Sequence, residues 1–173
     1  SDASVVDGSA TAAAAGGAIS VKVNALAQAQ SLATASFTSN TAVGAAGRLT
    51  LEMGTWNDDG TAFTTSGSPL NVDIAGTDTL SDIAAKINNS GASVSAMVVK
   101  GTSGVQLVLR GTTTGAASGF ALSATSSDGS ALASGSALQK LAYDPTSIAS
   151  GQSTITRSTK AQEAFFSIDG IEA

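Results

Sequence analysis

The residues that could do chemistry in this sequence are carboxylates and hydroxyls, because the chain contains no histidine and no cysteine. Without these two residue types there is no imidazole base, no thiol nucleophile and no nitrogen or sulfur ligand for zinc. A Ser-His-Asp triad is therefore impossible, and the sequence also lacks a glycine-rich phosphate-binding motif. The composition predicts a protein that is not an enzyme, with no catalytic residues, no metal and no cofactor.

The densest acidic segment, Asn57-Asp58-Asp59-Gly60, resembles part of a calcium-binding loop. An EF-hand loop needs an acidic first ligand and a glutamate at its last position. Those two places hold Thr55 and Ser66, so a β-turn is the better interpretation. A glycosidase pair of carboxylates from distant positions stays open, although sugar sites usually also offer stacking aromatic rings. The only tryptophan, Trp56, is either a candidate surface anchor for an adhesive contact or a packing residue.

Composition limits the partners that the surface can bind. The net charge is −5, and the eight lysines and arginines are scattered singly, so nucleic acid is not an expected partner. No apolar stretch approaches the length of a membrane span, and no membrane insertion is expected. Charged residues make up only 12% of the 173 residues. A surface made mostly of Ser, Thr, Asn and Gly is typical of strands and turns.

One amphipathic helix is predicted over about residues 79–89. Its apolar residues recur at helical spacing and form one stripe, which we expect to lie in the core together with a neighbouring hairpin. The opposite face, which includes Lys86, is predicted to be solvated. The residues of the stripe are Leu80, Ile83, Ala84 and Ile87.

Both ends of this helix carry capping signals. Thr79 is the predicted N-cap, and Asp82 three residues later completes a short variant of the capping box. At the other end, Gly91 is suited to the left-handed conformation that terminates many helices.

The remaining patterns are those of short strands. Val94–Lys100 and Val105–Arg110 predict a β-hairpin in which Leu107 and Leu109 are buried core residues. Residues 137–143 are predicted as a short helix, and the run 25–37 is ambiguous between a helix and an extended arm. The sequence therefore predicts a β-rich α+β fold of antiparallel sheets and one firm helix, in one domain or two small lobes. Further strands are predicted in residues 19–23 (half-buried), 48–53, 70–74, 120–124 and 164–168.

Three segments together resemble one family, the bacterial flagellar hook-associated protein 2, which caps the flagellar filament. Residues 19–37 resemble the stretch that leads into the head of that family. Residues 76–110 resemble the flagellin hook IN motif, named for an Ile-Asn pair that is Ile87-Asn88 here. Residues 161–171, with the sequence AQEAFFSIDGI, resemble the segment that closes the family's middle region.

The resemblance implies a nested organisation. Residues 1–18, rich in Ala, Gly and Ser, are predicted as a tail or linker. Residues 19–44 and 161–173 would form one base lobe, because each end has too few strands for a sheet of its own. Residues 45–160 would form a β-rich head domain that contains the IN motif. The long helical leg regions of the family are not present in this sequence, so the chain resembles a head fragment.

The resemblance also implies a function. The full-length protein would be secreted to the distal tip of the flagellum, form a homo-oligomeric ring, help flagellin subunits fold and insert, and contact host glycans. Without the legs, this chain is expected to be monomeric or weakly associated. Two other classes stay open: a flagellin or hook-filament junction subunit carrying the same motif, or an extracellular adhesin or carbohydrate-binding module.

Overall fold

The computed structural model describes residues 9–13, 16–133, 135–143 and 155–172. Within them, short strands form antiparallel sheets around a single α-helix, so the predicted β-rich α+β class is confirmed. The α-helix is α1 (Leu80–Asn89), and two 3-10 turns are η1 (Ala116–Ser118) and η2 (Gln139–Leu141). The strands are β1 (Val21–Ala25), β2 (Ser31–Ala33), β3 (Gly47–Trp56), β4 (Phe63–Thr65), β5 (Leu70–Ile74), β6 (Val94–Gly101), β7 (Gly104–Gly111), β8 (Gly119–Ser126), β9 (Thr156–Thr159), β10 (Phe165–Ile168) and β11 (Ile171–Glu172).

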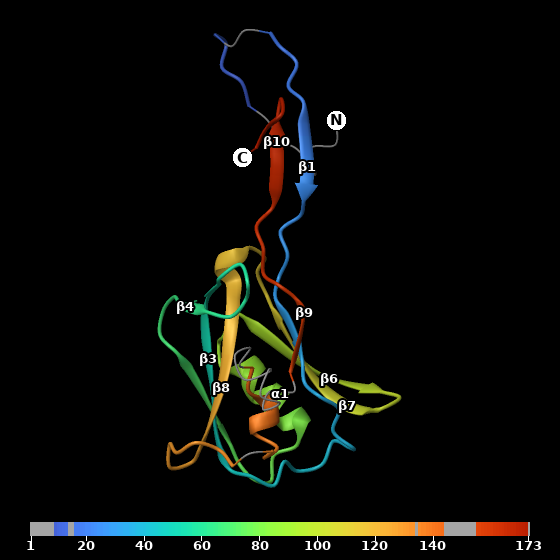
Figure 1. Cartoon of the computed structure of the whole chain (residues 1–173), viewed down its shortest axis with the longest axis vertical. Helices are drawn as coiled ribbons and strands as arrows, with labels where there is room; N and C mark the ends of the chain where they lie inside the picture. Colours follow the sequence, from blue (N-terminus) through green and yellow to red (C-terminus); the bar gives the residue numbers. More distant parts are fainter. Residues whose placement is uncertain (1–8, 14–15, 134, 144–154, 173) are drawn as a thin grey trace.

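Two four-stranded sheets build the body of the molecule (Figure 1). In one, β3 is central: β8 pairs along one edge, and β5 and β4 share the other. The other sheet has the order β6-β7-β2-β9, so it joins the hairpin to segments from both ends of the chain. Because side chains alternate between the faces of a strand, Leu49 and Leu51 of β3 point inward while Arg48 is exposed.

The core lies where the inner faces of these sheets meet α1. The helix packs mainly on β6 and also contacts β5 and β7. Apolar residues of both sheets and of the helix form one cluster. Full burial of each large aliphatic side chain contributes about 1.5–3 kcal/mol, so this cluster is the main source of stability. Its largest fully buried members are Phe120, Leu32, Leu49, Leu51, Leu80, Ile83, Ile87, Leu107, Leu109, Leu122, Leu138 and Leu141.

A narrow ribbon, the sheet β1-β10-β11, projects from this body at the top of Figure 1. Its first strand was predicted as half-buried over 19–23. The strand lies at 21–25 instead and is exposed along nearly its whole length. The burial prediction is wrong because no second layer made of described residues covers the ribbon.

The predicted base lobe differs from the structure in its first half. Residues 21–25 do pair with the other end of the chain, through β10. Residues 31–33, however, form β2 in the body, between β7 and β9, and Phe37 forms a bridge with Val105. The ambiguous run 25–37 is therefore extended, and its second half belongs with the hairpin because β7 offers it a free edge.

The short helix predicted over 137–143 is only the 3-10 turn η2. Leu138 and Leu141 are both fully buried, and a spacing of three residues stacks their side chains on one side of a 3-10 turn. The chain then leaves the turn at once, because the backbone N–H of Tyr143 donates to the carbonyl of Leu122 at 2.7 Å. This bridge to β8 takes the place of a further helical turn.

The helix N-terminus has a complete capping box. The Thr79 hydroxyl accepts a hydrogen bond from the Asp82 N–H at 3.2 Å, and the Asp82 carboxylate accepts one from the Thr79 N–H at 2.9 Å. The Thr79 hydroxyl also donates to the Asp82 carboxylate at 2.7 Å. The bond from the Thr79 N–H, and after it the bond from this hydroxyl, hold the pKa of Asp82 below its ordinary value of 3.8. At the other end, Gly91 has a φ of +79°, the left-handed conformation that glycine adopts without strain.

Lys86 does not lie on a simple solvated face as predicted. Its Nζ is 2.5 Å from Oδ2 of Asp78 and donates to the carbonyl of Asp73 at 3.0 Å. The turn between β5 and the helix brings Asp78 beneath Lys86, and the Asp78 side chain is only 13% exposed. Lys86 therefore ties the helix to the end of β5.

Replacing Ile83 with alanine should lower the free energy of unfolding by about 2–5 kcal/mol, since it leaves a cavity under a fully buried side chain. The exposed Asn89→Ala is the matched control on the same helix and should be nearly neutral. Urea unfolding followed by Trp56 fluorescence measures both. Equal midpoints for the two variants would show that the helix stripe is not core.

The free energy of unfolding should fall as acid protonates the Asp82 carboxylate of the capping box. Because the folded state lowers the pKa of Asp82, its contribution is present above the ordinary value and is lost as pH falls through the folded pKa. The destabilisation by Asp82→Asn should therefore be larger at about pH 6 than at about pH 2.5 in urea unfolding. Asp59→Asn, in an exposed turn, controls for the lost negative charge. The same destabilisation at both pH values would contradict this role of the carboxylate.

Candidate functional site

The helix and hairpin named by the sequence form one packed unit. All of the predicted core residues on them are buried, and Thr79 is the N-cap of the helix. The hairpin strands β6 and β7 pair in register along their whole length, from Val94 opposite Gly111 to Gly101 opposite Gly104. The buried residues of this unit are Leu80, Ile83 and Ile87 of α1 and Leu107 and Leu109 of β7.

Asn88 fixes the helix to the hairpin, a role that sequence reasoning did not assign to it. Its Nδ2 donates to the carbonyl of Ala96 at 2.8 Å, and its Oδ1 accepts from the N–H of Ala96 at 2.7 Å. The side-chain amide thus bonds both backbone groups of one residue on the sheet edge, as a neighbouring strand would. In the Ile-Asn pair, Ile87 fills the core and Asn88 closes the edge of β6. The sequence feature that could have indicated this role is an asparagine in the last helical turn, where a polar side chain can form hydrogen bonds with backbone groups.

Trp56 is not a surface anchor, because its side chain is only 7% exposed. Its Nε1 donates to the carbonyl of Phe120 at 3.1 Å, so the one polar atom of the ring is satisfied inside the protein. The ring centroid of Phe63 lies 4.7 Å away and that of Tyr143 lies 5.4 Å away in an edge-on arrangement. Burial raises the pKa of Tyr143, and the charge of Arg157 opposes this rise. Trp56 is therefore a packing residue, and it is not available as the surface anchor of an adhesive contact.

Arg157 of β9 covers this aromatic cluster. Its guanidinium carbon lies 5.9 Å from the centroid of the Trp56 ring, a cation–π distance. A side chain at Gly60 would place its Cβ 2.1 Å from a guanidinium nitrogen of Arg157, so the turn at Gly60 leaves this space for the arginine. One guanidinium nitrogen is buried without a hydrogen-bond partner. The packing on Trp56 and on the turn therefore holds this side chain in place.

The acidic turn after Trp56 is a structural turn. The side-chain oxygen of Asn57 accepts hydrogen bonds from the N–H groups of Thr61, at 2.8 Å, and Ala62, at 3.0 Å. Lys160 donates to the carbonyl of Asp58 at 2.9 Å and lies 3.7 Å from its carboxylate. Among the described residues, no group of three or more acidic side chains gathers where it could hold a metal ion.

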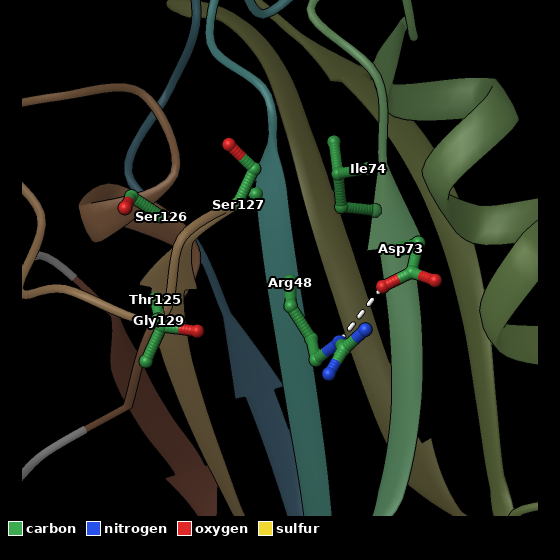
Figure 2. Close-up of a pocket in the computed structure, with 8 residues that line it drawn as sticks. Arg48, Asp73, Ile74, Thr125, Ser126, Ser127 and Gly129 are labelled. Atoms are coloured by element: carbon green, nitrogen blue, oxygen red, sulfur yellow. Dashed lines mark hydrogen bonds and ion pairs between the residues drawn. The ribbon is translucent and has the colours of Figure 1, made fainter.

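A cavity of about 320 Å³ is lined by residues at the ends of β3 and β5 and at the end of β8 with the loop that follows it. Figure 2 shows these residues. One carboxylate lines the cavity, that of Asp73, and this group pairs with Arg48 at 2.8 Å (dashed line in Figure 2). A glycosidase needs two carboxylates facing the bond that breaks. The cavity therefore does not supply the pair that the sequence left open.

Asp128 fixes the conformation of the loop beside this cavity. Its carboxylate accepts hydrogen bonds from the hydroxyls of Ser126 and Ser130 and from the N–H of Ser130. These bonds, with that of Ser126 first, hold the pKa of Asp128 far below its ordinary value. An acid with so low a pKa stays ionised and cannot donate a proton near neutral pH.

The fold and these contacts define a class of protein: a β-rich α+β module in which the polar and aromatic residues described above serve packing. The comparisons name the particular relatives. Residues 60–113 match the family model described as Flagellin hook IN motif, a wider span than the predicted 76–110. Comparison with curated proteins gives no match.

Solved structures of flagellar cap proteins are similar to the chain, and three of them illustrate the likeness. For the FliD D2-D3 domains from Escherichia coli the TM-score is 0.73 at 25% identity, covering 95% of this chain and 77% of that one. For the D1-D2-D3 domains of the same protein it is 0.69 at 25% identity, covering 90% and 40%. FliD from Pseudomonas aeruginosa has the same fold, with a TM-score of 0.64 at 24% identity, covering 95% and 68%. The predicted resemblance to the head of the filament cap, with an IN motif, is confirmed.

Replacing Asn88 with alanine should cost about 1–3 kcal/mol, since it leaves both backbone groups of Ala96 without these partners. Asn88→Asp keeps the acceptor but loses the donor, so we expect an intermediate loss. Urea unfolding measures all three proteins, with Asn89→Ala as the control one position along. If Asn88→Ala were as stable as Asn89→Ala, the two hydrogen bonds between Asn88 and Ala96 would contribute nothing to the free energy of unfolding.

Proposed function

We propose that this chain is the head part of a flagellar filament cap, a structural and assembly protein at the distal tip of the flagellum. In the full-length protein it would stand in a homo-oligomeric ring, over flagellin subunits that fold and insert beneath it. The observation that carries the proposal is the likeness to the FliD D2-D3 domains over 95% of this chain at a TM-score of 0.73.

The contacts of the described residues support a mechanical role. The Asn88 amide clasps the hairpin, Lys86 ties the helix to β5, and Arg157 covers the Trp56 cluster. The first two contacts fix the helix to the strands on either side of it, and the third joins segments far apart in the sequence. Together they would let the body keep its shape under load. Such a module needs no reacting group. The described residues also include no helix long and apolar enough to cross a membrane.

The alternatives have less support. A flagellin or hook-filament junction subunit would share the IN motif, but the likeness across both sheets is to cap proteins. The carbohydrate-binding alternative relied on Trp56 as its stacking ring, and Trp56 is buried. The proposal accordingly leaves out host glycans as a partner.

Immunogold electron microscopy of the parent bacterium tests the proposal. An antibody raised against this chain should label a single point at the distal end of each filament. Label along the whole filament would identify a flagellin instead, and label at the filament base would identify a junction subunit. A strain in which the coding segment is deleted is the control for specificity.

The same deletion strain gives an independent readout of assembly. If the chain belongs to the cap, deletion should leave hooks without filaments and release flagellin monomers into the medium. The full-length gene should restore filaments, and so should the gene carrying the exposed substitution Asn89→Ala. Normal filament length in the deletion strain would contradict a role in the cap.

A further inference from the structure

The strand β6 lies at the edge of its sheet, so one side of its backbone has no partner strand. In the order β6-β7-β2-β9, β7 pairs with β6 on its other side. Free N–H and C=O groups on an edge strand can accept a strand of another molecule, and proteins commonly block such edges. Figure 1 shows the hairpin pointing away from the body, so a second molecule can approach this edge.

Alternate residues of β6 direct their backbone groups toward the open side. In an antiparallel pair, residues that bond the partner strand alternate with residues whose groups point away from it. Ala96 points away from β7, because Asn88 bonds its carbonyl at 2.8 Å and its N–H at 2.7 Å. By the same alternation, the groups of Val98 and Lys100 face the open side. No residue in the part of the chain that the structure describes bonds these groups.

The composition of β6 suits the addition of another strand. Its sequence is VSAMVVKG, in which Lys100 is the one charged residue. Met97 and Val99 project from the face of the sheet that lies away from the core, and they are 57% and 40% exposed. Short segments of high β-propensity and low charge are those that pair edge to edge. An unblocked β6 would therefore be a site of association.

We propose that Asn88 blocks this edge, so that β6 does not pair with β6 of a second copy of the chain. The amide makes the two hydrogen bonds at Ala96 that an added strand would make, and toward the hairpin turn only Val98 and Lys100 stay open. Identical edges can pair antiparallel about a two-fold axis, so β6 of a second copy fits the unblocked edge. This inference rests on the helix and the hairpin and does not depend on the cap assignment.

Sedimentation equilibrium over about 10 µM to 1 mM compares the unsubstituted chain with Asn88→Ala. The unsubstituted chain should keep the mass of one copy. The mass of Asn88→Ala should rise toward two copies, with an association constant about tenfold higher or more. Near-ultraviolet circular dichroism of Trp56 checks that the variant is folded. Equal masses for the two proteins would overturn the proposal.

Two variants separate an open edge from a general loss of stability. Thr79→Ala removes the cap at the other end of the helix and should also destabilise the protein, but it leaves the bonds of Asn88 in place. Asn88→Asp loses the donor and places a charge on the edge, which opposes the pairing of identical strands. Both variants should keep the mass of one copy. Association of either as strong as that of Asn88→Ala would contradict the proposal, because lost stability would then be the cause.

A second substitution locates the contact on β6. Met97→Lys, added to Asn88→Ala, should return the mass to one copy, since two identical strands would bring like charges together. Ser123→Lys, at an exposed position of β8 in the other sheet, adds the same charge and is the matched control. This control, also added to Asn88→Ala, should leave the pair intact. Equal association of the two double variants would place the contact away from β6 and overturn the proposal.

Amide hydrogen exchange followed by nuclear magnetic resonance tests the block without any substitution. In the unsubstituted chain, the N–H of Ala96 should exchange about tenfold or more slowly than those of Val98 and Lys100, because Asn88 protects it. In Asn88→Ala at high concentration, the N–H of Val98 should become protected as the strands pair. If Ala96 exchanged as fast as Val98 in the unsubstituted chain, Asn88 would not hold the edge and the proposal would be wrong.

Discussion

A buried side-chain amide joins the two large sheets, and much of the structure depends on it. Gln30, which is fully buried between β1 and β2, donates from Nε2 to the carbonyl of Phe120 at 2.7 Å. Its Oε1 accepts a hydrogen bond from the backbone N–H of Phe120 at 3.0 Å. The backbone carbonyl of Gln30 meanwhile accepts from Gly111 at the end of β7. One residue thus bonds β7 with its backbone and β8 with its side chain, in a dry site where an unpaired amide is costly.

This tie also sets the position of the aromatic cluster. The carbonyl of Phe120 accepts from Trp56 as well as from Gln30, so the tryptophan is drawn to the same point. With its N–H satisfied there, the ring is free to pack against Phe63 and Tyr143 and beneath Arg157. The chain has few aromatic residues, and three of them, Trp56, Phe63 and Tyr143, fill this end of the body.

Local sequence patterns predicted the elements whose contacts are short in sequence. The stripe Leu80–Ile87 with the Thr79 cap predicted a helix, and the structure has it at Leu80–Asn89. The hairpin was predicted within a residue of each end, because its strands pair across a tight turn. Strand β4 was missed, since its three residues lie among turn formers and are held by pairing with β3. The core positions Leu107 and Leu109 followed from simple alternation, and both are buried.

The sequence by itself determined the helix, the hairpin and the lack of histidine and cysteine, because these depend on spacing of three or four residues, on alternation and on residue type. The tertiary structure alone decided what the polar residues do. Gln30 meets Phe120 across 90 positions, and Arg157 meets Trp56 only because β9 returns to β2. The tertiary structure also left β1 exposed, although its alternation looked like that of a half-buried strand. Alternation states which residues share a face, whereas burial depends on whether another layer comes to lie against it.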